Sequence, residues 1–325
     1  MSATFTILIL LALFFILEIF YFKIADYYNI IDMPNSRSSH KVITIRGGGI
    51  IFYLAVLAFF FSQAFQYPYF VLGLSLITIV SFLDDILTLN NKMRLSIHFI
   101  AVFLLIGEWG GNSLSLYLMP IVVILIIGTI NAYNFMDGIN GITGSYSLIT
   151  IIALFFINQE VVNFVASDLI LYAGLSLLVF NFFNFRTRAK CFAGDVGSVS
   201  IAFIITFLIG LLIIRTDNFA YILLLLVYGL DAATTIAFRL IRKENIFDAH
   251  RSHFYQYLAN EKKIPHIYIS LGYGIVQLLV NIIVVKLGTI AIASTILIIL
   301  GSTCVFIGVR LKIEGRIRLL KSATS

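Results

Sequence analysis

Residues 3–22 read ATFTILILLALFFILEIFYF, an apolar run that contains a single charged side chain, Glu18. A helix needs about 20 such residues to cross the hydrocarbon core of a bilayer, so this run predicts a membrane-spanning helix. Further apolar runs follow, separated by short polar breaks. Together they predict eleven spans, at residues 3–22, 50–65, 69–83, 95–106, 116–130, 143–157, 169–185, 199–214, 220–238, 267–285 and 289–309.

The composition of the whole chain agrees with this interpretation. Of its 325 residues, 60% are hydrophobic and 12% are charged, and the mean hydropathy is +1.02. A soluble domain carries roughly a quarter charged residues, so soluble classes are excluded. Open strand edges cannot be satisfied in lipid, and barrel strands would alternate polar with apolar residues. We therefore expect an all-α, polytopic membrane protein that forms a single integral-membrane domain over residues 1–325.

Basic residues set the expected orientation. The breaks after odd-numbered spans contain every Lys and Arg except Arg215 and Lys286. If the N-terminus lies outside, these breaks lie in the cytoplasm. Cytoplasmic loops carry the excess of Lys and Arg, so we expect a periplasmic N-terminus and a cytoplasmic C-terminus. The formal net charge of +6 is thus a topology signal and predicts no nucleic-acid partner.

Two polar motifs follow the third and fifth spans, on the expected cytoplasmic face. Asp84 and Asp85 are adjacent carboxylates, costly at a membrane boundary unless a cation or protonation offsets them. They predict a general base or a metal-site pair, with Arg94 placed to hold a phosphate; a solvated helix end is the alternative. Residues 131–141 read NAYNFMDGING. Asn131, Asn134 and Asp137 are expected on one helical face, with oxygen atoms that suit Mg²⁺, before Gly138 and Gly141 end the helix.

Two more motifs lie further along the same face. Residues 192–198 read FAGDVGS and open the eighth span, where a helix N-terminus favours anions and Asp195 could ligate a metal. A Gly-Asp turn with a Ser cap at an ordinary helix start explains this motif equally well. His250, Arg251 and His253 form a cluster suited to a diphosphate. Zinc is disfavoured there, because no Cys or second His pair stands at ligand spacing.

Three other features carry smaller expectations. The run Arg46-Gly47-Gly48-Gly49 before the second span permits close backbone approach. Asp231 lies inside the ninth span and is expected to face Arg239. The only two cysteines, Cys191 and Cys304, exclude a disulfide scaffold and are expected to be reduced.

Taken in order, the four motifs resemble those of the polyprenyl-phosphate N-acetylhexosamine-1-phosphate transferases. Asp84-Asp85 is similar to the family's aspartate pair, and residues 131–141 are similar to its Asn-x-x-Asn-x-x-Asp-Gly signature. Gly194 to Ser198 is similar to Gly-Asp-x-Gly-Ser, and residues 250–253 resemble its histidine-rich loop. The resemblance extends from Arg46 to Gln256.

The resemblance implies transfer of a sugar 1-phosphate from a UDP-sugar to undecaprenyl phosphate, with release of UMP. The implied setting is the bacterial inner membrane, at the start of cell-surface polysaccharide assembly such as that of O-antigen. Mg²⁺ is the implied cofactor, with Mn²⁺ as a substitute. The implied partners are a UDP-linked N-acetyl amino sugar, undecaprenyl phosphate, the lipid bilayer and, as an open alternative, a second copy of the chain in a homodimer.

The resemblance also implies a role for each site residue. Asn134 and Asp195 would ligate Mg²⁺, and Asp84 and Asp85 would serve the carrier phosphate. The remaining implied contacts are with the donor: the diphosphate at Arg94, His250, Arg251 and His253, and the nucleotide near Asn131, Asp137, Asn140 and Gly194.

Two alternatives concern substrate and class. The histidine loop ends in Phe254-Tyr255-Gln256, whereas members that use UDP-GlcNAc often carry two further histidines there. Replacing His by Tyr favours a less hydroxylated donor, such as a 6-deoxy sugar. A secondary transporter is the rival class. It predicts charged residues at helix centres and two related halves, but the acids gather at one face and no internal repeat is visible.

Overall fold

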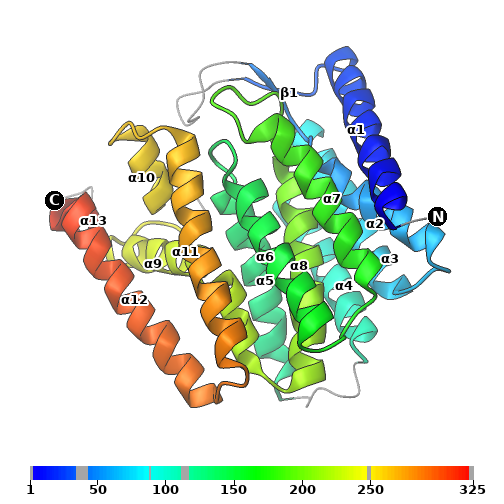
Figure 1. The fold of residues 1–325 in the computed structure, drawn as a ribbon. Helices are drawn as coiled ribbons and strands as arrows, with labels where there is room; N and C mark the ends of the chain where they lie inside the picture. Colours follow the sequence, from blue (N-terminus) through cyan, green and yellow to red (C-terminus); the bar gives the residue numbers. More distant parts are fainter. Residues whose placement is uncertain (1–2, 34–42, 88, 111–116, 247–249, 322–325) are drawn as a thin grey trace.

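The computed structural model describes residues 3–33, 43–87, 89–110, 117–246 and 250–321. These residues are almost entirely helical, apart from a short antiparallel pair of strands, β1 (Ile31–Asp32) and β2 (Thr44–Ile45). The helices, shown in Figure 1, are α1 (Ala3–Tyr27), α2 (Ile50–Ser62), α3 (Pro68–Leu87), α4 (Asn91–Glu108), α5 (Met119–Met136), α6 (Ile142–Glu160), α7 (Ser167–Asn184), α8 (Gly194–Thr216), the 3₁₀ turn η2 (Phe219–Leu225) leading into α9 (Leu226–Ile241), α10 (Phe254–Asn260), α11 (His266–Leu287), α12 (Ile292–Glu314) and α13 (Arg316–Leu320).

The all-α, polytopic membrane class is confirmed. Each predicted span coincides with one of these helices, and nine spans in the described part of the chain are long and apolar enough to cross a membrane. The other two are α2 and α4. Helix α2 has 13 residues, or about 20 Å at 1.5 Å per residue, and α4 carries Lys92, Arg94 and His98. The total of eleven spans therefore stays a prediction.

The breaks between helices alternate between two ends of the bundle, as the charge pattern requires. At one end, Gln63 after α2 donates to Asp168 at the start of α7 (2.8 Å). Asn218 after α8 donates to the carbonyl of Gly288 after α11 (3.1 Å). Arg215 and Lys286 belong to this end, and β1 lies at the opposite, upper end of Figure 1. The two exceptional cations thus share one face of the molecule.

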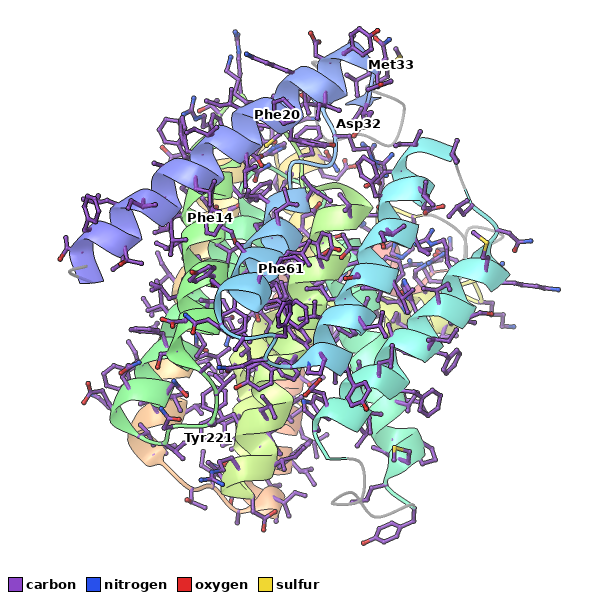
Figure 2. All side chains as sticks on the ribbon, turned by 90° about the vertical axis from the view of Figure 1, so that its right-hand side faces the viewer. Phe14, Phe20, Asp32, Met33, Phe61 and Tyr221 are labelled. Carbon is purple, nitrogen blue, oxygen red and sulfur yellow. The ribbon has the colours of Figure 1, made fainter. Side chains whose placement is uncertain are left out.

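Helix α8 forms the centre of the bundle and α12 lies at its margin. Along α8, Phe207 stacks on Phe70 of α3 with ring centroids 3.9 Å apart. Figure 2 shows α1 slanting along the outside, where Phe14 is buried and Phe20 is 60% exposed. Exposed apolar side chains of this kind are expected where lipid replaces water. The buried α8 therefore provides the rigid element whose N-terminus carries Asp195.

Candidate functional site

The site begins where α3 ends against the N-terminus of α8. The side chain of Asp85 is fully buried and accepts hydrogen bonds from the backbone N–H groups of Asp195 (3.1 Å) and Val196 (3.0 Å). Arg46 pairs with the same carboxylate at 2.7 Å. The first N–H groups of a helix lack intrahelical partners, so Asp85 caps α8 and fixes the backbone of Asp195.

Asp195 lies between two guanidinium groups. Its carboxylate oxygens are each 3.4 Å from a nitrogen, one of Arg46 and the other of Arg94. Arg94 in turn pairs with Asp84 at 2.6 Å. Three carboxylates and two guanidinium groups therefore alternate in one row, which we call the acid–guanidinium row: Asp84, Arg94, Asp195, Arg46 and Asp85. The structure brings together Asp84, Asp85, Arg94 and Asp195 and adds Arg46, which the motifs alone did not assign to the site.

Glycines bring Arg46 to this row. The N–H of Gly48 donates to the carbonyl of Phe192 (2.9 Å), so the segment after β2 pairs with the connection into α8. A Cβ on Gly49 would lie 2.3 Å from the Cα of Gly197, a distance that real side chains do not tolerate. Gly194 adopts φ +71°, and its Cβ would lie 2.7 Å from the carboxylate of Asp85. The expected close backbone approach is thus confirmed, and Gly194 serves packing of the site.

The end of α5 supplies the next residues, with one correction. Asn134 donates from Nδ2 to Ser198 (3.3 Å), one turn beyond Asp195 on α8, which leaves its amide oxygen open. Asn131 is exposed one turn earlier. Helix α5 stops at Met136, and Asp137 is the first residue beyond it, with ψ 56°. The expected common helical face therefore ends before Asp137. Gly138 follows, so the chain leaves the helix one residue earlier than predicted.

Asp137 is a half-buried acid beside the row. Burial raises its pKa from 3.8 to about 7; the charges of Asp195 and Asp85 add to this shift, and the charge of Arg46 opposes it. Within the described residues no Lys or Arg forms an ion pair with Asp137. The row and Asp137 together therefore contain four carboxylates and two guanidinium groups.

Asn140 has a structural environment. It is buried, and its Nδ2 donates to the carbonyls of Arg186 (2.9 Å) and Thr187 (3.3 Å). These bonds tie the α5–α6 turn to the connection between α7 and α8. Its amide nitrogen is thus committed to the fold, and the expected place of Asn140 near the nucleotide stays a prediction.

The histidine loop reaches the α5 turn through Phe135. The rings of His250 and His253 stack with centroids 5.1 Å apart, and each lies 6.1 Å from the ring of Phe135. Burial, followed by the charges of His253 and Arg239, lowers the pKa of His250 to about 4. The N–H of Ser252 donates to its Nδ1 (3.3 Å), so neutral His250 carries its proton on Nε2. Arg251 is half-buried between the two histidines.

Tyr255 and Asp231 differ from the expectations. Tyr255 is fully buried and donates to the carbonyl of Phe135 (2.8 Å), against Gly138. Its hydroxyl is therefore used within the protein, and its position gives no support to a 6-deoxy donor. Asp231 does not pair with Arg239, which binds Glu244 (3.0 Å) instead, because α9 ends at Ile241 and the chain turns back.

Part of the chain matches a known family. The model of glycosyl transferase family 4 matches residues 67–214, from the start of α3 almost to the end of α8. Within these residues the chain is similar to this family. The match contains Asp84, Asp85, Arg94, Asn134 and Asp195, and so covers most of the acid–guanidinium row and the α5 turn.

Individual relatives are named as transferases. The chain is 26% identical to a Bacillus subtilis protein named as a probable undecaprenyl-phosphate N-acetylglucosaminyl 1-phosphate transferase, over 73% of the chain and 71% of the relative. It is 26% identical to the Escherichia coli K12 undecaprenyl-phosphate alpha-N-acetylglucosaminyl 1-phosphate transferase, over 62% and 60%. It is 29% identical to the phospho-N-acetylmuramoyl-pentapeptide-transferase of Thermotoga maritima, over 47% and 56%. The chain thus spans less than two thirds of the last two relatives.

The side chains of the site suit a hard cation. The described residues contain no group of three His, Cys, Asp or Glu side chains that could hold a metal ion. Mg²⁺ commonly takes only one or two carboxylates, together with substrate phosphates and water. Asp195, the open amide oxygen of Asn134 and the acid at Asp137 provide this oxygen-rich environment. The donor set therefore fits Mg²⁺ that is completed by a phosphate ligand.

Proposed function

We propose that the protein transfers an N-acetylated amino-sugar 1-phosphate from a UDP-sugar to undecaprenyl phosphate and releases UMP. The reaction would take place at the cytoplasmic face of a bacterial inner membrane, as the first membrane step of a cell-surface polysaccharide such as O-antigen. The observation that carries the proposal is the acid–guanidinium row at one end of the bundle. Relatives named for this transfer support it.

The two arginines of the row are suited to bind phosphates. Their side chains are 34% and 29% exposed, for Arg46 and Arg94, whereas Asp85 behind them is fully buried. A guanidinium group has five N–H donors, so each arginine can keep its carboxylate and still donate to a phosphate oxygen. Both reactants are anions. The two guanidinium groups would reduce the repulsion between them and stabilise the negative charge that develops on the leaving UMP.

The two aspartates of the pair would have different roles. Asp84 keeps 10% of its side chain exposed and binds Arg94, whereas Asp85 is enclosed by α8 and Arg46. We assign the contact with the carrier phosphate to Asp84. Asp85 would position Asp195 through the backbone of α8 rather than touch a substrate.

Mg²⁺ is part of the proposal, with Asn134 and Asp195 as its protein ligands. The ion would neutralise diphosphate charge and stabilise the leaving group. His250 would contribute a neutral N–H donor to the diphosphate, and Arg251 a positive charge beside it.

Purified protein in nanodiscs, supplied with undecaprenyl phosphate and a panel of UDP-sugars, tests the proposal. We expect turnover with at least one UDP-linked 2-acetamido sugar, loss of turnover in excess EDTA, and recovery with Mg²⁺ or Mn²⁺. Full activity in EDTA would contradict the metal assignment. Turnover with UDP-glucose but with no 2-acetamido sugar would contradict the donor class.

A further inference from the structure

Behind the histidine loop, four helices enclose the carboxylate of Asp231. It is fully buried on α9 and accepts hydrogen bonds from the first N–H groups of α10, at Phe254 (2.9 Å) and Tyr255 (3.2 Å). The hydroxyl of Tyr273 on α11 donates to it at 2.6 Å. Its Oδ1 also lies 3.3 Å from Nδ1 of His253.

The partners of Asp231 define its charge state. The backbone N–H groups can only donate, and the hydroxyls of Tyr273 and Thr235 donate to it as well. Arg310 of α12, 1% exposed, adds a positive charge 4.0 Å from Oδ1. An ionised carboxylate accepts and never donates. The proton between Asp231 and His253 therefore belongs to Nδ1 of the histidine.

The other ring nitrogen of His253 has no partner. Its Nε2 is buried, and within the described part of the chain no group forms a hydrogen bond with it. A buried polar atom without a partner costs free energy, so a ligand that reached this nitrogen would remove that cost. The centroid of the His253 ring lies 6.1 Å from that of Phe135, a residue that stands between Asn134 and Asp137 in the sequence. A ligand held by the α5 turn would lie close to this nitrogen.

We propose that Asp231 is a positioning residue that holds the His253 ring with Nδ1 protonated and directs Nε2 toward a phosphate oxygen of the sugar-nucleotide donor. This proposal rests on the proposed function, because the phosphate comes from that donor. Asp231 acts through His253 and touches no substrate itself. With Asp231 on one side of the ring and the phosphate on the other, the ring is protonated on both nitrogens in the complex.

A purely structural role is the competing explanation, since Asp231 also caps α10. The two explanations differ in how Asp231 and His253 combine. If Asp231 acts through His253, the loss of His253 also removes the contribution of Asp231. The decreases in kcat caused by the two substitutions are then not multiplicative. If Asp231 only caps a helix, the two losses multiply.

The test is a double-mutant cycle on the purified protein. We expect Asp231→Asn and His253→Gln each to lower kcat about 10- to 100-fold, as loss of a residue that orients a functional histidine typically does. The double variant should be no slower than His253→Gln alone. A matched control is Tyr273→Phe, which removes a donor to the other oxygen of Asp231; it should lower the melting temperature while kcat stays within about twofold. Multiplicative losses in the double variant would overturn the proposal.

A second measurement does not depend on the folding of Asp231→Asn. The chain has five histidines, so ¹⁵N-labelled imidazole signals can be resolved in wild-type protein, with His253→Gln assigning the signal. We expect a protonated Nδ1 in the free protein and protons on both nitrogens after UDP is added. An unprotonated Nδ1, or a ring that does not respond to UDP, would overturn the proposal. Wild-type protein without any transfer activity would instead refute the proposed function.

Discussion

Asp195 is the residue on which the two arginines and the cap of α8 converge. Because Asp85 holds it through backbone N–H groups, Asp195→Asn should leave the α8 N-terminus intact. We expect this variant to lose at least about 100-fold in kcat, as is typical when a group that stabilises transferring charge is lost. Its melting temperature should stay close to that of the wild type. Turnover near the wild-type rate would remove Asp195 from the reaction.

His250 predicts a specific dependence of stability on pH. Its pKa in the folded protein is about 4, below the ordinary value of 6.5, so the folded state favours the neutral ring. The unfolded chain takes up the proton first as the pH falls. The stabilising contribution is therefore complete above pH 6.5 and is lost between pH 6.5 and pH 4.

Melting temperatures in detergent at pH 7.5 and pH 5 check this prediction. His250→Gln should lose less stability over this interval than the wild type, because glutamine does not titrate. An equal loss in both proteins would contradict the assignment of a depressed pKa to His250.

The contact between the glycine segment and α8 connects distant parts of the chain. Gly49 and Gly197 meet backbone to backbone, so Gly197→Ala should push the segment outward and displace Arg46. We expect reduced activity and a lower melting temperature together. Gly301→Ala on α12 is the matched control, because a Cβ there meets nothing within 4 Å. Equal behaviour of the two variants would show that the close approach is unimportant.

The sequence predicts the positions of the helices better than the contacts between them. Apolar runs locate the helices, because lipid requires each span to satisfy its own backbone. The role of Arg46 was not predictable, since its partner Asp195 lies 149 residues away. The predicted helical position of Asp137 is wrong by one residue, because α5 ends at Met136. The predicted partner of Asp231 is wrong, since α10 packs against α9 and its first N–H groups donate to this carboxylate.

The charge partition makes a prediction for the whole molecule. Because Arg215 and Lys286 lie at one end and the acid–guanidinium row at the other, the row should face the cytoplasm. A reporter fused after Ser325 should report a cytoplasmic location, and one inserted in the break after α11 should report a periplasmic location. The opposite pair of results would invert the orientation and remove the site from the cytoplasmic pool of nucleotide sugars.

The identity of the released nucleotide tests the central claim most directly. Transfer of a sugar 1-phosphate breaks the diphosphate and releases UMP, whereas transfer of the sugar alone releases UDP. In wild-type protein with undecaprenyl phosphate, Mg²⁺ and the preferred UDP-sugar, we expect UMP in equal amount to the lipid product, and almost none with Asp195→Asn. Release of UDP, or release of UMP that does not require undecaprenyl phosphate, would contradict the proposed reaction.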